Sequence, residues 1–321
     1  MRPITDLLEA SQFSTGLLVG FLALVVALPM ALGLSALFPR RGHRPGVAGP
    51  AFAVAVVLAL RGALGTDPIA AVPSDVVTGL VLLWLAGTIA SRTPAPGLIG
   101  PVAALPGAIV LAGANDGLAA GWVPLLIGAG TVVIGATAAD FDRRTGRFGL
   151  GPLLLFVSVG GIYATVPDTE LMRAVVGVAL ALVFLAWPYA AASLGAGGAY
   201  AAVGLLLWIA PIEGIGRAGS IVGAAGAFAL LVGEPLGRLL ARELEGRTRL
   251  HRYPIGRPRS TLLVAQVLLV LYATRVAGMA QTASSALILL VPGFVASVAF
   301  GVLLVMPERR KHRTDASAPT G

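Results

Sequence analysis

Eleven apolar runs, of which the third, eighth and ninth are short, dominate the sequence, separated by short segments that carry charge, proline or glycine. A helix needs about 20 predominantly apolar residues to cross a bilayer, because each residue adds about 1.5 Å along the helix axis. We therefore predict membrane-spanning helices at residues 16–38, 47–64, 76–90, 97–114, 121–139, 148–166, 171–192, 198–212, 218–233, 260–276 and 284–306. The expected fold class is all-α: a polytopic integral membrane helix bundle.

Composition excludes most water-soluble classes of protein. Hydrophobic residues make up 57% of the 321-residue chain and charged residues only 12%, whereas a soluble globular domain has about 25% charged residues. A cytosolic enzyme, a nucleic-acid-binding module and a disordered chain are therefore excluded. The chain contains no cysteine, so disulfides, thiolate metal sites and a cysteine nucleophile are excluded as well.

The basic residues predict how the helices are oriented. In membrane proteins, Lys and Arg gather in the short loops on the cytoplasmic side. If the N-terminus lies outside, 18 of the 23 Lys and Arg residues fall in inner loops or the C-terminal tail. Only Arg2, Arg61, Arg173, Arg217 and Arg275 remain outside. We therefore expect an N-out, C-in protein in a bacterial-type cytoplasmic (plasma) membrane.

The loops are too short for an extramembrane domain, so residues 1–321 are expected to form a single transmembrane domain. Residues 1–15 form an outer N-terminal segment, and residues 307–321 are predicted to be a disordered cytoplasmic tail. Residues 234–259 form a cytoplasmic loop in which leucines alternate with charge at helical spacing, which predicts an amphipathic helix in the headgroup layer. Its arginines are candidate contacts for anionic lipid headgroups: Arg238, Arg242, Arg247 and Arg249. An ordinary interfacial connector is the alternative.

Three Gly-Pro pairs follow one another at equal spacing. Gly49-Pro50, Gly100-Pro101 and Gly151-Pro152 are 51 residues apart, each near the inner start of a predicted helix. Internal repeats are common in transporter folds, where the binding site lies between the repeats. A chain this rich in glycine and proline also produces such pairs by chance, so a repeat and a coincidence both remain open.

Polar residues on the outer side form the first candidate site, for substrate binding. An ionisable side chain at the centre of a membrane helix costs about 2.5 to 3.5 kcal/mol, so such residues lie at interfaces or mark function. The candidates are Tyr163, Thr165, Asp168, Glu170, Arg173 and Glu213. The alternative is structural: Asp168 caps the next helix, Glu170 pairs with Arg173 three residues on, and Glu213 belongs to a tight turn.

Two inner carboxylates form a second, weaker candidate. Asp140 and Asp142 are two residues apart at a helix end, and Mg²⁺ favours carboxylate and phosphate oxygens. The following Arg143 and Arg144 offer an alternative, a surface ion pair. The chain has no H-E-x-x-H, G-x-S-x-G or Walker sequence, and no cofactor is expected.

Three functions remain open from the sequence. The first is a transporter or flippase-like protein for a small solute or lipid-linked molecule, with an outer vestibule at the substrate-binding candidates. The second is a non-catalytic membrane subunit or scaffold of an envelope-assembly complex, and the third is a membrane-embedded transferase acting on a lipid phosphate. The expected partners are the bilayer, anionic headgroups at the inner face and a membrane protein in the scaffold case, with no nucleic acid.

Overall fold

The computed structural model describes residues 7, 9–37, 44–63, 72–114, 123–145, 149–165, 170–186, 190–213, 218–245, 257–280 and 282–305. Within these ranges the chain is helical apart from short connections, and no strand occurs. Residues 1–6 and 8 of the expected outer N-terminal segment lie outside the described residues, as do residues 246–256 of the inner loop and the predicted tail. The rest of the N-terminal segment is helical from Ser11 on.

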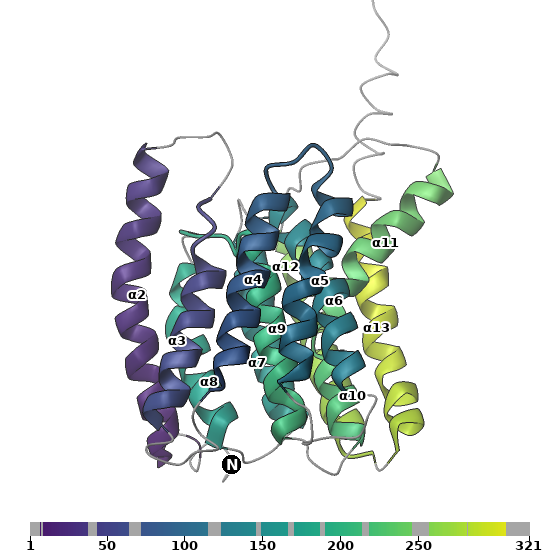
Figure 1. Cartoon of the computed structure of the whole chain (residues 1–321). Helices are drawn as coiled ribbons and strands as arrows, with labels where there is room; N and C mark the ends of the chain where they lie inside the picture. The colour runs from purple at the N-terminus through teal and green to yellow at the C-terminus, as the bar shows by residue number, and fades with distance from the viewer. Residues whose placement is uncertain are drawn as a thin grey trace, which may run out of the picture.

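Each of the eleven predicted segments contains a helix. In chain order the helices are α2 (Ser11–Leu37), α3 (Ala48–Ala63), α4 (Ser74–Ala90), α5 (Pro96–Gly113), α6 (Val123–Thr145), α7 (Leu150–Thr165), α8 (Glu170–Leu182) with the 3-10 turn η2 (Val183–Leu185), α9 (Ala196–Glu213), α10 (Ala218–Gly226), α11 (Ala229–Glu245), α12 (Arg257–Gly278) and α13 (Ala283–Val305). They run alongside one another, with α2 at one flank and α13 near the opposite flank (Figure 1). The predicted all-helical fold is confirmed.

Length and composition separate the helices into two groups. Among the described residues, α2, α5, α6 and the stretch Ser284–Val302 of α13 are long and apolar enough to cross a membrane. Further helices of the described residues are apolar but shorter: Ala48–Gly62, Ser74–Ala90, Leu150–Thr165, Leu171–Leu185, Ala196–Pro211 and Gln266–Gly278. This arrangement is consistent with an integral membrane bundle, while eleven crossings remain a prediction.

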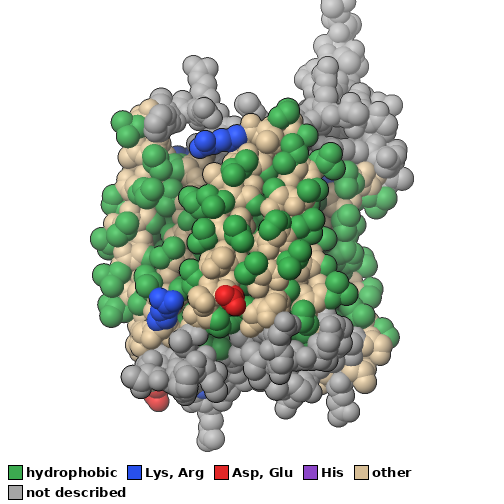
Figure 2. Space-filling model, in the orientation of Figure 1, with side chains coloured by type: hydrophobic (Ala, Val, Ile, Leu, Met, Phe, Trp, Pro, Cys, Tyr) green, Lys and Arg blue, Asp and Glu red, His purple; other side chains and the backbone are tan. Residues whose placement is uncertain are grey.

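The outer surface of the bundle is apolar. Leu18, Val25 and Val26 of α2 are 63%, 69% and 67% exposed, and a water-soluble protein seldom exposes such a continuous row of large apolar side chains. On the face shown in Figure 2, charged groups appear only toward the two ends, and a broad band between them is hydrophobic side chain and backbone. Lipid is the solvent that suits this band.

Small residues hold the helices together. A Cβ added at Gly49 of α3 would lie 2.6 Å from the backbone of Gly198 at the start of α9, and one at Gly87 of α4 would lie 2.7 Å from Gly197. Such distances mean that the helix backbones touch. Close approach through small residues is how membrane helices associate, since lipid gives no hydrophobic drive for helix contact.

We predict that Gly49→Ala destabilises the protein by about 1–3 kcal/mol, because neither backbone can move away cheaply. Gly33→Ala on α2 is the matched control, since a Cβ there meets nothing within 4 Å; alanine should stabilise that helix by up to about 1 kcal/mol. Thermal unfolding in detergent, followed by size-exclusion chromatography, measures both variants. Equal midpoints for the two would contradict the proposed backbone contact.

The seventh predicted helix ends early. We expected a helix over 171–192, but α8 ends at Leu182, η2 ends at Leu185, and residues 190–195 are not helical. Pro188 lies in the intervening sequence; proline lacks the backbone N–H that a helix interior needs and clashes with the preceding turn. The seventh and eighth predicted segments therefore remain two helices, α8 and α9, and the chain is not helical at 190–195 between them.

The ninth predicted segment also differs. The helix expected over 218–233 breaks at Ala227 and Phe228, and α11 then continues to Glu245, into the region assigned to the inner loop. The hydroxyl of Ser158 on α7 donates to the carbonyl of Ala227 at 2.9 Å, which satisfies a group that the break exposes. The glycine-rich sequence from Gly219 to Gly226 weakens the helix before the break.

α11 is amphipathic, but its polar side faces inward. Leu236, Leu239 and Leu240 are 42–55% exposed, whereas Glu234 and Arg238 are 1% and 5% exposed. The glycines of the same side, Gly233 and Gly237, pack against α13. The first half of the predicted inner loop is therefore part of the bundle.

Candidate functional site

The non-helical segment 190–195 crosses one end of the bundle and is buried there. It hydrogen-bonds to the residues that lead into α3: Ala48 N–H donates to the carbonyl of Ser193 at 3.0 Å, Gly49 N–H to that of Leu194 at 3.3 Å, and Ser193 N–H to that of Pro45 at 2.8 Å. Buried irregular backbone is tolerated in membrane proteins only where its polar groups are satisfied by protein or line a cavity. Both conditions hold here.

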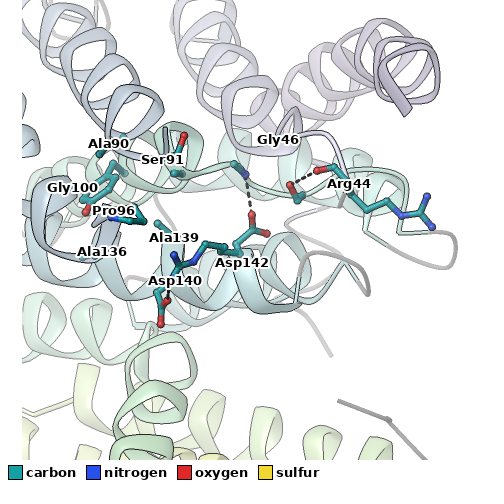
Figure 3. A pocket seen from close by; sticks show the side chains of 17 residues that line it. Arg44, Gly46, Ala90, Ser91, Pro96, Gly100, Ala136, Ala139, Asp140 and Asp142 are labelled. Atoms are coloured by element: carbon teal, nitrogen blue, oxygen red, sulfur yellow. Dashed lines mark hydrogen bonds and ion pairs between the residues drawn. The ribbon is translucent and has the colours of Figure 1, made fainter. Parts of the chain in front are cut away.

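Asp142, in the last turn of α6, binds the end of the same segment. Its carboxylate is 3% exposed and accepts the N–H of Leu194 at 2.9 Å and that of Gly195 at 3.0 Å. One of these hydrogen bonds is drawn in Figure 3. Because hydrogen bonds to an ionised carboxylate are among the stronger ones, Asp142 fixes the start of α9 to the end of α6.

A cavity of about 370 Å³ lies beside this junction. The first turns of α5 and α9, the last turns of α4 and α6, and the residues before α3 surround it. Its walls are largely glycine and alanine, with Pro96, Gly100 and Ala139 visible among the lining residues in Figure 3. Polar groups from Ser91, Asp140 and Asp142 also line it. By the orientation predicted from the arginines, this is the inner end of the bundle.

A chain of ion pairs begins at the cavity and runs away from it. Asp140 pairs with Arg143 at 2.7 Å and with Arg144 at 2.8 Å, and Arg144 reaches Glu234 of α11 at 3.3 Å. Glu234 also binds Arg238 one turn further along α11. The side chains of Arg144, Glu234 and Arg238 are 11%, 1% and 6% exposed, so this chain is a buried electrostatic contact between α6 and α11.

Tyr200 closes one wall of the cavity. Its side chain is 2% exposed, its ring packs against the position of Gly135, and its hydroxyl lies opposite Gly100, where an added Cβ would be 2.9 Å away. No residue that the structure describes accepts or donates a hydrogen bond at this hydroxyl. A buried phenol normally finds a partner, so the group is available to a molecule in the cavity.

The outer candidates are placed only in part. Tyr163 is half-buried and Thr165 is buried at the end of α7, where the Thr165 hydroxyl donates to the carbonyl of Ile162 at 2.7 Å. Arg173 lies half-buried in the first turn of α8. Glu170 begins α8 and Glu213 ends α9, but the side chains of both, and the whole of Asp168, lie outside the described residues. Their role in substrate binding stays a prediction.

The headgroup arginines and the carboxylate pair are also placed in part. Arg238 is buried against Glu234, the side chain of Arg242 is not described, and Arg247 and Arg249 fall outside the described ranges. Asp140 binds arginines whereas Asp142 binds backbone amides. No cluster of three or more His, Cys, Asp or Glu residues that would hold a metal occurs in the part of the chain that the structure describes.

Three features at this end of the bundle were not predicted from the sequence: the non-helical segment 190–195, the inward-facing Glu234 and the phenol of Tyr200. Glu234 and Arg238 are four residues apart, a spacing that predicts pairing on one helix face, so this contact was available from the sequence. The Gly195-Ala196-Gly197-Gly198 run was a signal of close backbone contact. Tyr200 had no comparable signal.

The fold and the cavity define a class: a helical bundle with an apolar surface, helices of membrane-spanning length and a polar cavity at one end. Beyond that class, no protein-family model and no curated protein sequence matches the chain. Function is therefore argued from the site.

Proposed function

We propose that the protein is a multi-pass transporter or flippase-like protein of the cytoplasmic membrane, which receives a small solute or lipid-linked molecule in the cavity at its inner end. It crosses the membrane eleven times, with the N-terminus outside and the C-terminus inside. The helix in each of the eleven predicted segments supports the count. The alternation of arginines along the chain supports the orientation.

The observation that carries this proposal is the cavity beside the buried non-helical segment 190–195, which connects α8 to α9. Non-helical backbone at membrane depth is tolerated where it is buried in protein or lines a water-filled cavity, and Ser193 and Gly195 of this segment line the cavity. The cavity volume of about 370 Å³ is in the range of small-molecule pockets. A scaffold that only holds partner proteins together does not require a cavity of this size, so the cavity favours transport.

The transferase alternative receives less support. It requires Asp140 and Asp142 to act together on a metal and a phosphate, but the carboxylate of Asp142 accepts two backbone N–H groups and that of Asp140 binds two arginines. Each acid is thus engaged with the protein itself. A carboxylate that fastens two helix ends is better explained as a structural residue.

Cysteine labelling tests the proposal, since the chain has no native cysteine. Ser74 and Ser91 lie at opposite ends of α4, and both are exposed. A membrane-impermeant maleimide should label Ser91→Cys and the cavity position Ala139→Cys only in inside-out vesicles, and Ser74→Cys only in intact cells. Reversed labelling of the two serine positions would overturn the orientation. Labelling of Ser91→Cys without Ala139→Cys would show a closed cavity and favour the scaffold.

A further inference from the structure

Two buried polar atoms, one on α6 and one on α9, have no partner among the described residues. The hydroxyl of Thr131 on α6 and the indole N–H of Trp208 on α9 are buried without a hydrogen bond to any described residue. Other buried hydroxyls in the same bundle are satisfied: those of Thr145, Ser158 and Ser297 each donate to a carbonyl at 2.8–2.9 Å. Unsatisfied buried polar atoms are rare in proteins and require an explanation.

Thr131 and Trp208 lie on the same two helices as the cavity residue Tyr200 and its neighbour Gly135, but further from the cavity. α6 and α9 pack side by side. Tyr200 lies against Gly135, and one turn further along α9, Gly204 lies against Thr131, whose methyl group is 3.1 Å from an added Cβ. Trp208 follows after another turn, which places it about 12 Å along the helix axis from Tyr200. Tyr200 and Thr131 therefore lie on the α6–α9 contact, and Trp208 lies further along α9 from the cavity; we call these three residues the polar stripe.

The stripe differs from the remaining unsatisfied atoms. The hydroxyl of Ser35 and the side-chain carbonyl of Gln266 are also without a partner, but they lie singly on α2 and α12. Among the described residues, the unpaired groups of Thr131 and Trp208 are the ones that follow from the described cavity along α6 and α9. A stripe of this kind is explained by a polar molecule that occupies it in another state of the protein.

The chemistry of the stripe indicates what that molecule carries. An indole N–H only donates, whereas a phenol and an aliphatic hydroxyl donate or accept. None of the three side chains is charged. Moving an ion from water to a site between these helices would therefore cost a large free energy of dehydration. Of the four charged groups that line the mouth, Asp140 and Arg143 pair with each other, Asp142 accepts two backbone N–H groups, and the exposed Arg44 points away from the cavity (Figure 3).

We propose that the cavity is the inner mouth of a path along the α6–α9 contact, and that the path takes a small uncharged molecule bearing hydroxyl or carbonyl oxygens, such as a polyol. This proposal rests on the proposed transport function and narrows its substrate class. It also assigns Tyr200, Thr131 and Trp208 as the residues that hydrogen-bond the solute on its way.

Thiol reactivity at Thr131 tests the path. Thr131→Cys is nearly isosteric, and Ser297→Cys is the matched control, because Ser297 is equally buried but satisfied and lies on a different helix contact. In inside-out vesicles, N-ethylmaleimide should react with Thr131→Cys at least about tenfold faster than with Ser297→Cys, because reactivity follows access. An anionic thiosulfonate should react with Ser91→Cys but not with Thr131→Cys. Equal maleimide rates at Thr131 and Ser297 overturn the path, and rapid reaction of Thr131→Cys with the anion overturns the uncharged substrate class.

A second variant keeps the inference falsifiable if the cysteine protein does not fold. Thr131→Val removes the unpartnered hydroxyl and keeps the shape, so the thermal midpoint of the solute-free protein should rise; a fall would show that the hydroxyl has a protein partner. The two proposals also fail separately. If Ser91→Cys and Ala139→Cys are reached from the inner side but Thr131→Cys is not, only the path is wrong; if Ala139→Cys is not reached, the transport proposal fails.

Discussion

Glu234→Gln should be the most damaging single substitution considered for this protein. It removes the negative charge between Arg144 and Arg238, and all three side chains are no more than 11% exposed. Removing one partner of a buried ion pair costs about 3–5 kcal/mol; Arg144 keeps its pair with Asp140, so most of this cost comes from Arg238, which loses the carboxylate of Glu234. We therefore expect a large fall in the thermal midpoint in detergent, together with loss of the monodisperse peak on size exclusion.

Two further variants show whether the loss of stability in Glu234→Gln comes from the lost charge or from a change in side-chain shape. Asp75→Asn neutralises an exposed acid at the start of α4 and should change stability by no more than about 0.5 kcal/mol. The triple replacement of Arg144, Glu234 and Arg238 by methionine should recover most of the loss, since buried ion pairs are often replaceable by apolar groups of similar volume. A Glu234→Gln protein as stable as the wild type would show that the ion-pair chain does not hold α11 to α6.

Asp142→Ala is expected to have the second largest effect. It leaves the N–H groups of Leu194 and Gly195 without their acceptors in a buried place, which costs about 3 kcal/mol or more for two hydrogen bonds to a charged group. Asp142→Asn keeps one acceptor oxygen and should lose less. Hydrogen exchange at residues 190–195 measures the effect directly, because these amides should lose protection before the helices do.

Asp140→Asn is the neighbouring control for this prediction. Asp140 is 37% exposed and pairs with arginines on its own helix, and such partly exposed pairs contribute at most about 1 kcal/mol. Its substitution should leave protection of segment 190–195 unchanged. Equal loss of protection in the two variants would mean that Asp142 is not the residue that fastens α9.

Most of the fold was predictable because hydropathy alone locates helices in a membrane protein. The helix boundaries followed charge, glycine and proline, and α2, α5 and α13 lie within a few residues of their predicted ranges. The early end of α8 was harder to predict: residues 171–192 are almost uniformly apolar, and Pro188 is the one residue there that indicates a helix end before residue 192.

The site was less predictable than the fold for a physical reason. Leucines and arginines at helical spacing in residues 234–259 were interpreted as a helix in the headgroup layer, but α11 packs into the bundle through the side that carries Gly233, Gly237 and the ion pair. The cavity is formed by residues from five separate stretches of the chain, which no local pattern brings together. Polar clusters attract attention in a sequence, whereas Tyr200 and Thr131 stand alone among apolar neighbours.

The position of α9 has a consequence for biosynthesis. Segment 190–195 supplies the partners of Asp142 and of the first amides of α3, yet the ribosome makes it after both. Until it emerges, α3 and α6 stand in the membrane with an unpaired acid and exposed backbone N–H groups, while α9 must enter between helices already inserted. The nascent bundle therefore lacks the contacts between α3, α6 and α9 until α9 is inserted. We expect membrane quality-control proteases to degrade chains that are halted before residue 190 faster than the full chain.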